Sequence, residues 1–180
     1  MDPSTGSWRR LSQDPANEVE ASWSRNGQWI YFGSDKTGRP EIWKIPASGG
    51  LPVQLTKGGG LAASESPDRK WVYYSKDAAS PTTLWKIRPS GGEETQVADG
   101  LSYSLNFVVA NKGIYYMVAR EGADRTSIAF LDFATEKTAT LLTLDKPWWY
   151  GMAISPDQRS ILFSVVDNAG SDLMLVENLH

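Results

Sequence analysis

Ile42-Trp43-Lys44-Ile45-Pro46-Ala47-Ser48-Gly49-Gly50 decides the fold, because the chain repeats it as Leu84-Trp85-Lys86-Ile87-Arg88-Pro89-Ser90-Gly91-Gly92. Looser copies stand at 128–132 and 173–177, so the leading apolar positions 42, 84, 128 and 173 are 42, 44 and 45 residues apart. A period of about 40–45 residues with four short strands per unit is typical of a β-propeller.

Each repeat divides into an inner, a second, a third and an outer strand. Within this pattern, Trp29-Ile30-Tyr31-Phe32 is a second strand that is apolar on both faces, as a strand covered on both sides would be. No stretch shows a helical period, so we expect an all-β chain over 1–180, forming a single or partial propeller. Its four blades are predicted at about 19–56, 61–98, 103–142 and 149–178, with one more outer strand at 8–12.

The strand at 8–12 has no blade in front of it, and the fourth blade has no outer strand of its own. We therefore expect the N-terminal strand to complete the last blade and cover an otherwise exposed sheet edge. The pairing would close a four-bladed ring within one chain, or two chains would exchange strands to form an eight-bladed dimer. A third alternative is that the chain is the last part of a longer propeller.

Composition excludes several classes of function. The net charge is −3 and no basic stripe is present, so nucleic-acid binding is not expected. The chain has no cysteine, which removes disulfides, thiolate catalysis and cysteine metal sites. No apolar run approaches a membrane span, and Met1 to Gly6 lack signal-peptide features, so an export signal would lie outside this sequence.

Two turns and their flanking strands carry a family resemblance. Ser66-Pro67-Asp68-Arg69-Lys70-Trp71 and Ser155-Pro156-Asp157-Gln158-Arg159, together with the Ser-Gly-Gly turns, resemble the WD-like propeller repeat of the TolB family. The third unit lacks the Ser-Pro-Asp turn, and the first has Ser24-Arg25-Asn26-Gly27 in its place. The resemblance implies a platform that binds proteins or peptides, often outside the cytoplasm, as in the periplasm. It also implies a C-terminal sensory module of the kind fused to CadC-like regulators.

Catalytic and metal motifs are weak. The single histidine is His180, the last residue, which is a poor base for a Ser-His-Asp triad. The run 33–39 imitates a phosphate loop, but Arg39 and Pro40 replace the Lys-Ser/Thr pair that holds phosphate and magnesium. The oxygen-rich run 167–172 lacks the closing Glu of a calcium loop. We expect no enzyme activity, no cofactor and no metal.

The candidate binding residues cluster at the predicted channel. Trp148, Trp149 and Tyr150 stand just before the fourth inner strand, in a predicted rim loop. Neighbouring residues of an extended chain alternate faces, so at least one of these aromatics should be exposed as a binding anchor. Glu65 replaces Trp23 of the first repeat and would form a polar channel mouth with Tyr103 and Asn106; a solvated Glu65 is the alternative.

These features favour a non-catalytic scaffold that binds a protein or peptide. The alternative function is a self-assembling half-propeller whose main partner is a second copy, a homodimer formed by strand exchange. The mass in solution separates the two, because one chain and two chains differ by a factor of two.

Overall fold

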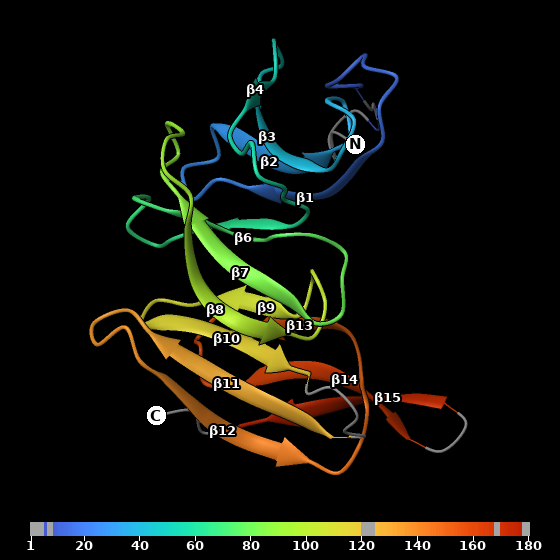
Figure 1. Ribbon diagram of the computed structural model, residues 1–180, viewed down its shortest axis with the longest axis vertical. Helices are drawn as coiled ribbons and strands as arrows, with labels where there is room; N and C mark the ends of the chain where they lie inside the picture. The colour runs from blue at the N-terminus through green and yellow to red at the C-terminus, as the bar shows by residue number, and fades with distance from the viewer. Residues whose placement is uncertain (1–5, 7–8, 120–124, 168–169, 178–180) are drawn as a thin grey trace.

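The computed structural model describes residues 6, 9–119, 125–167 and 170–177, and within these ranges the chain contains fifteen strands and no helix. The strands form three hydrogen-bonded sheets of four, eight and three strands. The N-terminal sheet lies at the top of Figure 1, and the C-terminal sheet lies at the height of the lower strands of the eight-stranded sheet. The expectation of an all-β chain is confirmed.

The first sheet has its strands in chain order, each antiparallel to the next. Its members are β1 (Glu18–Trp23), β2 (Trp29–Ser34), β3 (Glu41–Pro46) and β4 (Val53–Gln54). The second and third strands supply the core, with Tyr31 and Ile42 almost completely buried. Tyr31 and Phe32, neighbours that face opposite sides of β2, are 1% and 6% exposed, so both faces of the strand are covered there, as the sequence predicts.

The eight-stranded sheet consists of two four-stranded units. The first unit contains β5 (Ala63–Glu65), β6 (Val72–Ser75), β7 (Thr82–Ile87) and β8 (Thr95–Leu101), and the second contains β9 (Phe107–Val109), β10 (Gly113–Val118), β11 (Thr126–Asp132) and β12 (Thr138–Leu144). One ladder pair, Leu101 with Val118, joins them. Two backbone hydrogen bonds beside this pair, from Ala119 N to Gly100 O and from Ser102 N to Met117 O, also join the two units.

The last sheet has three strands in the order β13 (Trp148–Ile154), β14 (Ile161–Asp167) and β15 (Gly170–Val176). It packs against the preceding unit through an apolar cluster that includes Tyr115, Met117 and Phe163. The inner strands β1, β5, β9 and β13 are successive neighbours, which is the arrangement of blades around a propeller axis. Among the described residues, no ladder pair joins the first sheet to the last one.

The tight turn after each inner strand explains the repeated Ser-x-Asp/Asn sequence. The Ser66 hydroxyl donates to Asp68 Oδ1 at 2.7 Å and accepts from Trp71 N at 3.0 Å. Ser24 and Ser155 make the same pair of bonds in their own turns. The third unit has Ala110 instead and keeps only a backbone bond, Ala110 N to Gly113 O. The sequence drift of that unit is thus a change of turn, and the strands on both sides are retained.

The N-terminal segment differs from the prediction. Leu11 packs against Phe32, Trp43 and Ile45 of the first sheet. The Arg9 guanidinium donates to the carbonyl oxygens of Ala47 and Ser48 in the hairpin of that sheet. Residues 9–17 form no strand, and β15 has no neighbour on its outer edge within the described ranges. Completion of the last blade within one chain, and the closed four-bladed ring that depends on it, are therefore not confirmed; Trp8 lies outside the described residues.

Candidate functional site

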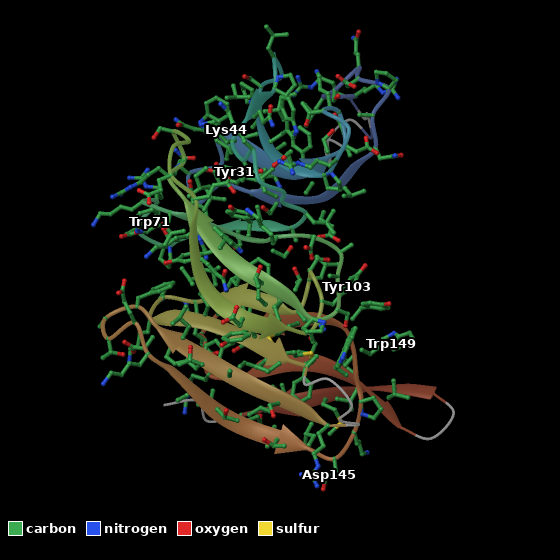
Figure 2. The ribbon with its side chains drawn as sticks, viewed as in Figure 1. Tyr31, Lys44, Trp71, Tyr103, Asp145 and Trp149 are labelled. Atoms are coloured by element: carbon green, nitrogen blue, oxygen red, sulfur yellow. The ribbon has the colours of Figure 1, made fainter. Side chains whose placement is uncertain are left out.

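An aromatic ledge marks one face of the molecule. It consists of Tyr103, Trp148, Trp149 and Tyr150, whose rings contact one another. Tyr103 stacks on Trp148 with ring centres 6.1 Å apart and meets Tyr150 edge-on at 4.5 Å. Figure 2 shows Tyr103 and Trp149 on the same side of the molecule. The structure thus brings together four of the six residues predicted for the site.

The three consecutive aromatics begin a strand, where the sequence predicts a loop. They are the first residues of β13, whose register shifts between Trp148 and Met152. Gly151 lies in this bulge with φ +97°, a conformation that few other residues adopt. Trp148 packs on the core cluster between the last two units, while Trp149 and Tyr150 remain 46% and 47% exposed. The expectation that at least one ring is exposed is confirmed.

Asn106 lies beneath the ledge and holds it in place. The side chain is completely buried, and its amide nitrogen donates to Ser102 Oγ at 2.8 Å and to the Trp149 carbonyl at 3.2 Å. Its amide oxygen accepts the Gly151 N–H at 2.9 Å. The Asn106 amide therefore bonds the backbone carbonyl before Tyr150 and the backbone N–H after it. Asn106 positions the aromatics and is covered from solvent.

Glu20 stands beside this face and was not predicted. Its Oε1 accepts the Ser104 hydroxyl at 3.2 Å, whereas Oε2 is buried without a hydrogen-bond partner in the described part of the chain. Burial raises the pKa of the Glu20 carboxyl, and the Ser104 bond only partly opposes this. Its φ of +53° is unusual for a residue other than glycine. No sequence pattern distinguishes Glu20 from other strand residues.

Among the described residues, Glu65 makes no hydrogen bond or ion pair with the ledge; its partners are Arg25 and Tyr31. Its side chain is 5% exposed, and its carboxylate accepts the Arg25 backbone N–H at 2.6 Å and the Tyr31 hydroxyl at 2.8 Å. Arg25 also donates to the Glu65 carbonyl and, at 3.0 Å, to the carbonyl of Val109. The predicted channel mouth of Glu65 with Tyr103 and Asn106 does not form. Glu65 instead joins the first sheet to β5, and its solvated alternative is excluded by the same burial.

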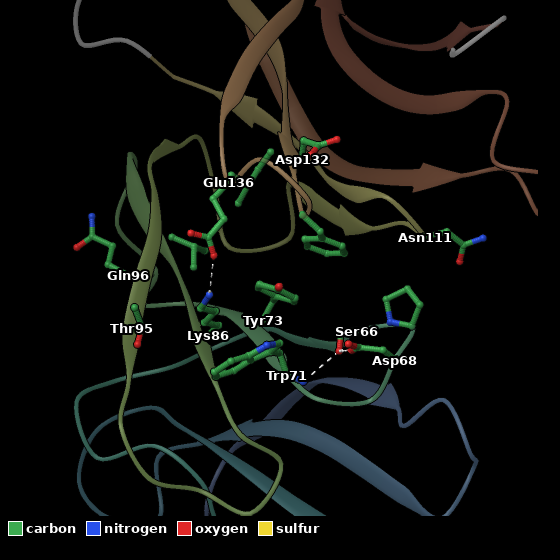
Figure 3. A pocket seen from close by; sticks show the side chains of 14 residues that line it. Ser66, Asp68, Trp71, Tyr73, Lys86, Thr95, Gln96, Asn111, Asp132 and Glu136 are labelled. Atoms are coloured by element: carbon green, nitrogen blue, oxygen red, sulfur yellow. Dashed lines mark hydrogen bonds and ion pairs between the residues drawn. The ribbon is translucent and has the colours of Figure 1, made fainter.

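A pocket of about 550 Å³ lies between the β5–β8 unit and the β9–β12 unit. Trp71 and Tyr73 of the first unit form one wall, and the β11–β12 hairpin forms the other (Figure 3). In that hairpin, Phe133 stacks on Tyr73 with ring centres 5.3 Å apart, and Glu136 lies 3.7 Å from the Lys86 ammonium. Trp71 lies on the side of the molecule away from Tyr103 and Trp149 (Figure 2).

The remaining motifs give little chemistry. The phosphate-loop imitation is the end of β2 and a hairpin in which Arg39 Nε pairs with Glu41 Oε1 at 2.7 Å. No cluster of three His, Asp or Glu residues suited to a metal occurs among the described residues, and no helix there could cross a membrane. His180 and part of the oxygen-rich run 167–172 lie outside the described residues.

Known structures with this architecture are β-propellers. TolB from Acinetobacter baumannii matches with a TM-score of 0.71 and 18% identity over 87% of this chain and 40% of that one. Oligogalacturonate lyase from Vibrio parahaemolyticus matches with a TM-score of 0.66 and 14% identity over 88% and 49%. A chain of the nidogen/laminin complex matches with a TM-score of 0.66 and 11% identity over 87% and 60%. No family model matches the sequence.

The fold is that of a TolB-like β-propeller, as the sequence predicts. The chain spans between two fifths and about three fifths of the three propeller chains named above. At these identities the similarity establishes the fold, and function has to be argued from the site.

Proposed function

We propose that this chain is a non-catalytic binding module that contacts a protein or peptide partner through the aromatic ledge. The observation that carries the proposal is the exposure of Trp149 and Tyr150 on a strand that a fully buried amide, Asn106, holds from beneath. Large aromatic side chains supply much of the binding energy of protein interfaces. A rigid ledge also loses little conformational entropy when a partner binds.

Glu20 adds a polar group to the same face. Ser104, which bonds to Glu20, follows Tyr103 directly in the chain. The unpartnered Glu20 Oε2 is a hydrogen-bond acceptor that a partner N–H could satisfy after a small rearrangement. An aromatic surface beside an acceptor suits a polypeptide, which offers both apolar side chains and backbone donors.

The fold alone does not choose between binding and catalysis. The similar structures include a chain from a complex of two proteins, nidogen and laminin, and a lyase. The proposal therefore depends on the geometry of the aromatic ledge.

Selection of peptides on the protein tests this function. A displayed library of random dodecapeptides is selected on the wild type and counter-selected on the Trp149→Ala/Tyr150→Ala variant. Loss of two aromatic anchors should weaken selected peptides by about 100-fold. Trp23→Ala is the control, since Trp23 is 64% exposed on β1 and is not part of the ledge. Peptides that bind the double variant and the wild type equally well would refute the proposal.

The open edge of β15 favours a second candidate, assembly with another copy of the chain. Leu173 and Leu175 on this strand are 70% and 58% exposed, and unpaired apolar edges attract further strands. A mass of two chains in solution that returns to one chain in Leu173→Lys/Leu175→Lys would support strand addition at this edge. A monomer at high protein concentration would contradict it.

A further inference from the structure

The pocket between the β5–β8 and β9–β12 units contains a tyrosine hydroxyl group that has no hydrogen-bond partner among the described residues. Tyr73 lines the pocket and is 5% exposed as a residue, yet its phenol oxygen makes no hydrogen bond with any described residue. Figure 3 shows Tyr73 next to Trp71, and Phe133 of the hairpin stacks on Tyr73. The ring of Tyr73 is buried, but its hydroxyl oxygen is not enclosed by protein, so it is available to a ligand in the pocket.

The preceding repeat shows why this hydroxyl is unpartnered. Tyr31 pairs with Lys44 across β2 and β3, as Tyr73 pairs with Lys86 across β6 and β7, so the two tyrosines are equivalent. Tyr31 donates to Glu65, the last residue of the next inner strand. The last residue of the inner strand that follows Tyr73 is Val109, which has no side-chain acceptor. Because Val109 stands where the preceding repeat has Glu65, the Tyr73 hydroxyl has no acceptor at this place and is available to a ligand.

Negative charge predominates around the pocket. The residues that line it include three acids, Asp68, Asp132 and Glu136, but only one base, Lys86. Asp68 and Glu136 have only loose ion pairs, 3.4 Å to Lys70 and 3.7 Å to Lys86. Burial, followed by the charges of Asp68 and Glu136, raises the pKa of Tyr73 to about 12. Both carboxylates therefore act on the phenol, which stays neutral at physiological pH.

Aromatic rings give the pocket an apolar wall that also attracts cations. Trp71 already faces two of them, with the Lys86 ammonium 4.8 Å and the Arg88 guanidinium 3.9 Å from its ring centre. Phe133 covers Tyr73 from the opposite unit. An alkyl stem can pack on such rings while its charged end reaches carboxylates.

We infer that this pocket binds an alkylammonium or guanidinium group, carried by a lysine or arginine side chain or by a free amine. The cation would donate hydrogen bonds to the Tyr73 phenol oxygen and to the carboxylates of Asp68 and Glu136, and its stem would pack against Trp71 and Phe133. The volume of about 550 Å³ is in the ordinary range for small-ligand pockets. The site is distinct from the aromatic ledge and does not depend on it.

Titration with small probes tests the inference. Acetyl-Gly-Lys-Gly-amide, acetyl-Gly-Arg-Gly-amide and cadaverine are added to the ¹⁵N-labelled full chain, with acetyl-Gly-norleucine-Gly-amide as the uncharged counterpart. We expect the cationic probes to shift amide signals of β6, β7 and the β11–β12 hairpin with dissociation constants on the order of 1 mM. Tighter binding of a tripeptide than of cadaverine indicates a polypeptide source, and the reverse indicates a free amine; either result supports the cation site.

Matched variants assign the binding to the pocket. Glu136→Gln and Tyr73→Phe should each weaken the cationic probes by about tenfold, because the first removes a negative charge and the second removes a hydrogen-bond acceptor at the cation. Tyr31→Phe, the equivalent change in the preceding repeat, should leave probe affinity unchanged. The dispersion of the amide spectrum shows that each variant is folded. Equal affinity for the norleucine and lysine peptides, no shift at about 20 mM probe, or wild-type affinity in Tyr73→Phe and Glu136→Gln would each overturn the inference.

Discussion

Tyr31 and Tyr73 stand at the same position of two successive repeats, but their hydroxyl groups meet different neighbours. Tyr31 donates to Glu65 and helps to seal the contact between the first sheet and β5. Tyr73 faces a pocket, because Val109 occupies the place that would correspond to Glu65. One side-chain exchange on an inner strand thus turns a structural contact into a candidate ligand site, while the strands around it are unchanged.

Glu65→Val should have the largest effect on stability, because it gives the Tyr31 contact the valine that stands at the equivalent place beside Tyr73. The substitution leaves the Arg25 N–H and the Tyr31 hydroxyl without their acceptor. Two buried donors that lose a charged acceptor should lower the free energy of unfolding by about 3 kcal/mol. Urea denaturation measures the change. A loss below about 1 kcal/mol would mean that this carboxylate contributes little to joining the two sheets.

Removal of each tyrosine hydroxyl tests whether Tyr31 and Tyr73 differ in their hydrogen-bond partners. Tyr31→Phe should lower the free energy of unfolding by about 1.5 kcal/mol, because Glu65 loses a buried donor. Tyr73→Phe should change it by less than about 0.5 kcal/mol, because no protein bond is lost. Equal losses in the two variants, measured under the same denaturant conditions, would show that the hydroxyls have equivalent partners after all.

The two cross-strand lysines differ in the same way. Lys44 donates to the Pro89 carbonyl at 2.6 Å and lies 4.3 Å from the centre of the Trp29 ring, and burial lowers the pKa of its ammonium although Glu65 opposes this. Lys44→Met should therefore cost about 1 kcal/mol of stability. Lys86→Met should cost less and should tighten the binding of acetyl-Gly-Lys-Gly-amide by a few fold, since it removes the competing cation. Weaker probe binding in Lys86→Met would count against the proposed charge balance.

Glu20 differs from Glu65 in the same way: both oxygens of the Glu65 carboxylate accept hydrogen bonds, whereas Oε2 of Glu20 has no partner in the described part of the chain. Burial raises its pKa in the folded chain, so ionisation disfavours the native state and stability falls as the pH rises through that pKa. Glu20→Gln should therefore stabilise the protein at pH 7 by about 0.5 kcal/mol or less, and the gain should vanish at low pH, where the wild-type carboxyl is neutral too. Thermal unfolding of both proteins is measured between about pH 3 and pH 7, a range that includes the titration of glutamate in the unfolded chain. A constant difference across that range would exclude a protonation effect.

Much of the scaffold is predictable because it depends on local patterns. The repeated Ile/Leu-Trp-Lys-Ile strands and the Ser-x-Asp/Asn turns place the strands within a few residues of their observed ends. β13 begins earlier than the sequence predicts, because the bulge at Gly151 lets Trp148 start a strand that is longer than the other inner strands. The three adjacent aromatics still indicated the exposed ledge, since side chains of an extended chain alternate.

The roles of Glu65 and of the pocket could not be predicted from local patterns. Strand alternation turns Glu65 towards the axis, but whether it meets water or Tyr31 depends on how the neighbouring sheet packs. The pocket likewise forms only when Phe133 and Glu136 of the β11–β12 hairpin fold over Tyr73 and Lys86. A comparison between repeats could have found the signal, because both tyrosines are retained while Glu65 becomes Val109.

The ladder pair between Leu101 and Val118 has a mechanical consequence. Backbone bonds fasten the two central units to each other, whereas the first and last sheets share no ladder with their neighbours in the described ranges. The outer sheets can therefore open at lower free-energy cost than the central pair. Among the described strands, amide hydrogen exchange should therefore reach β10 last.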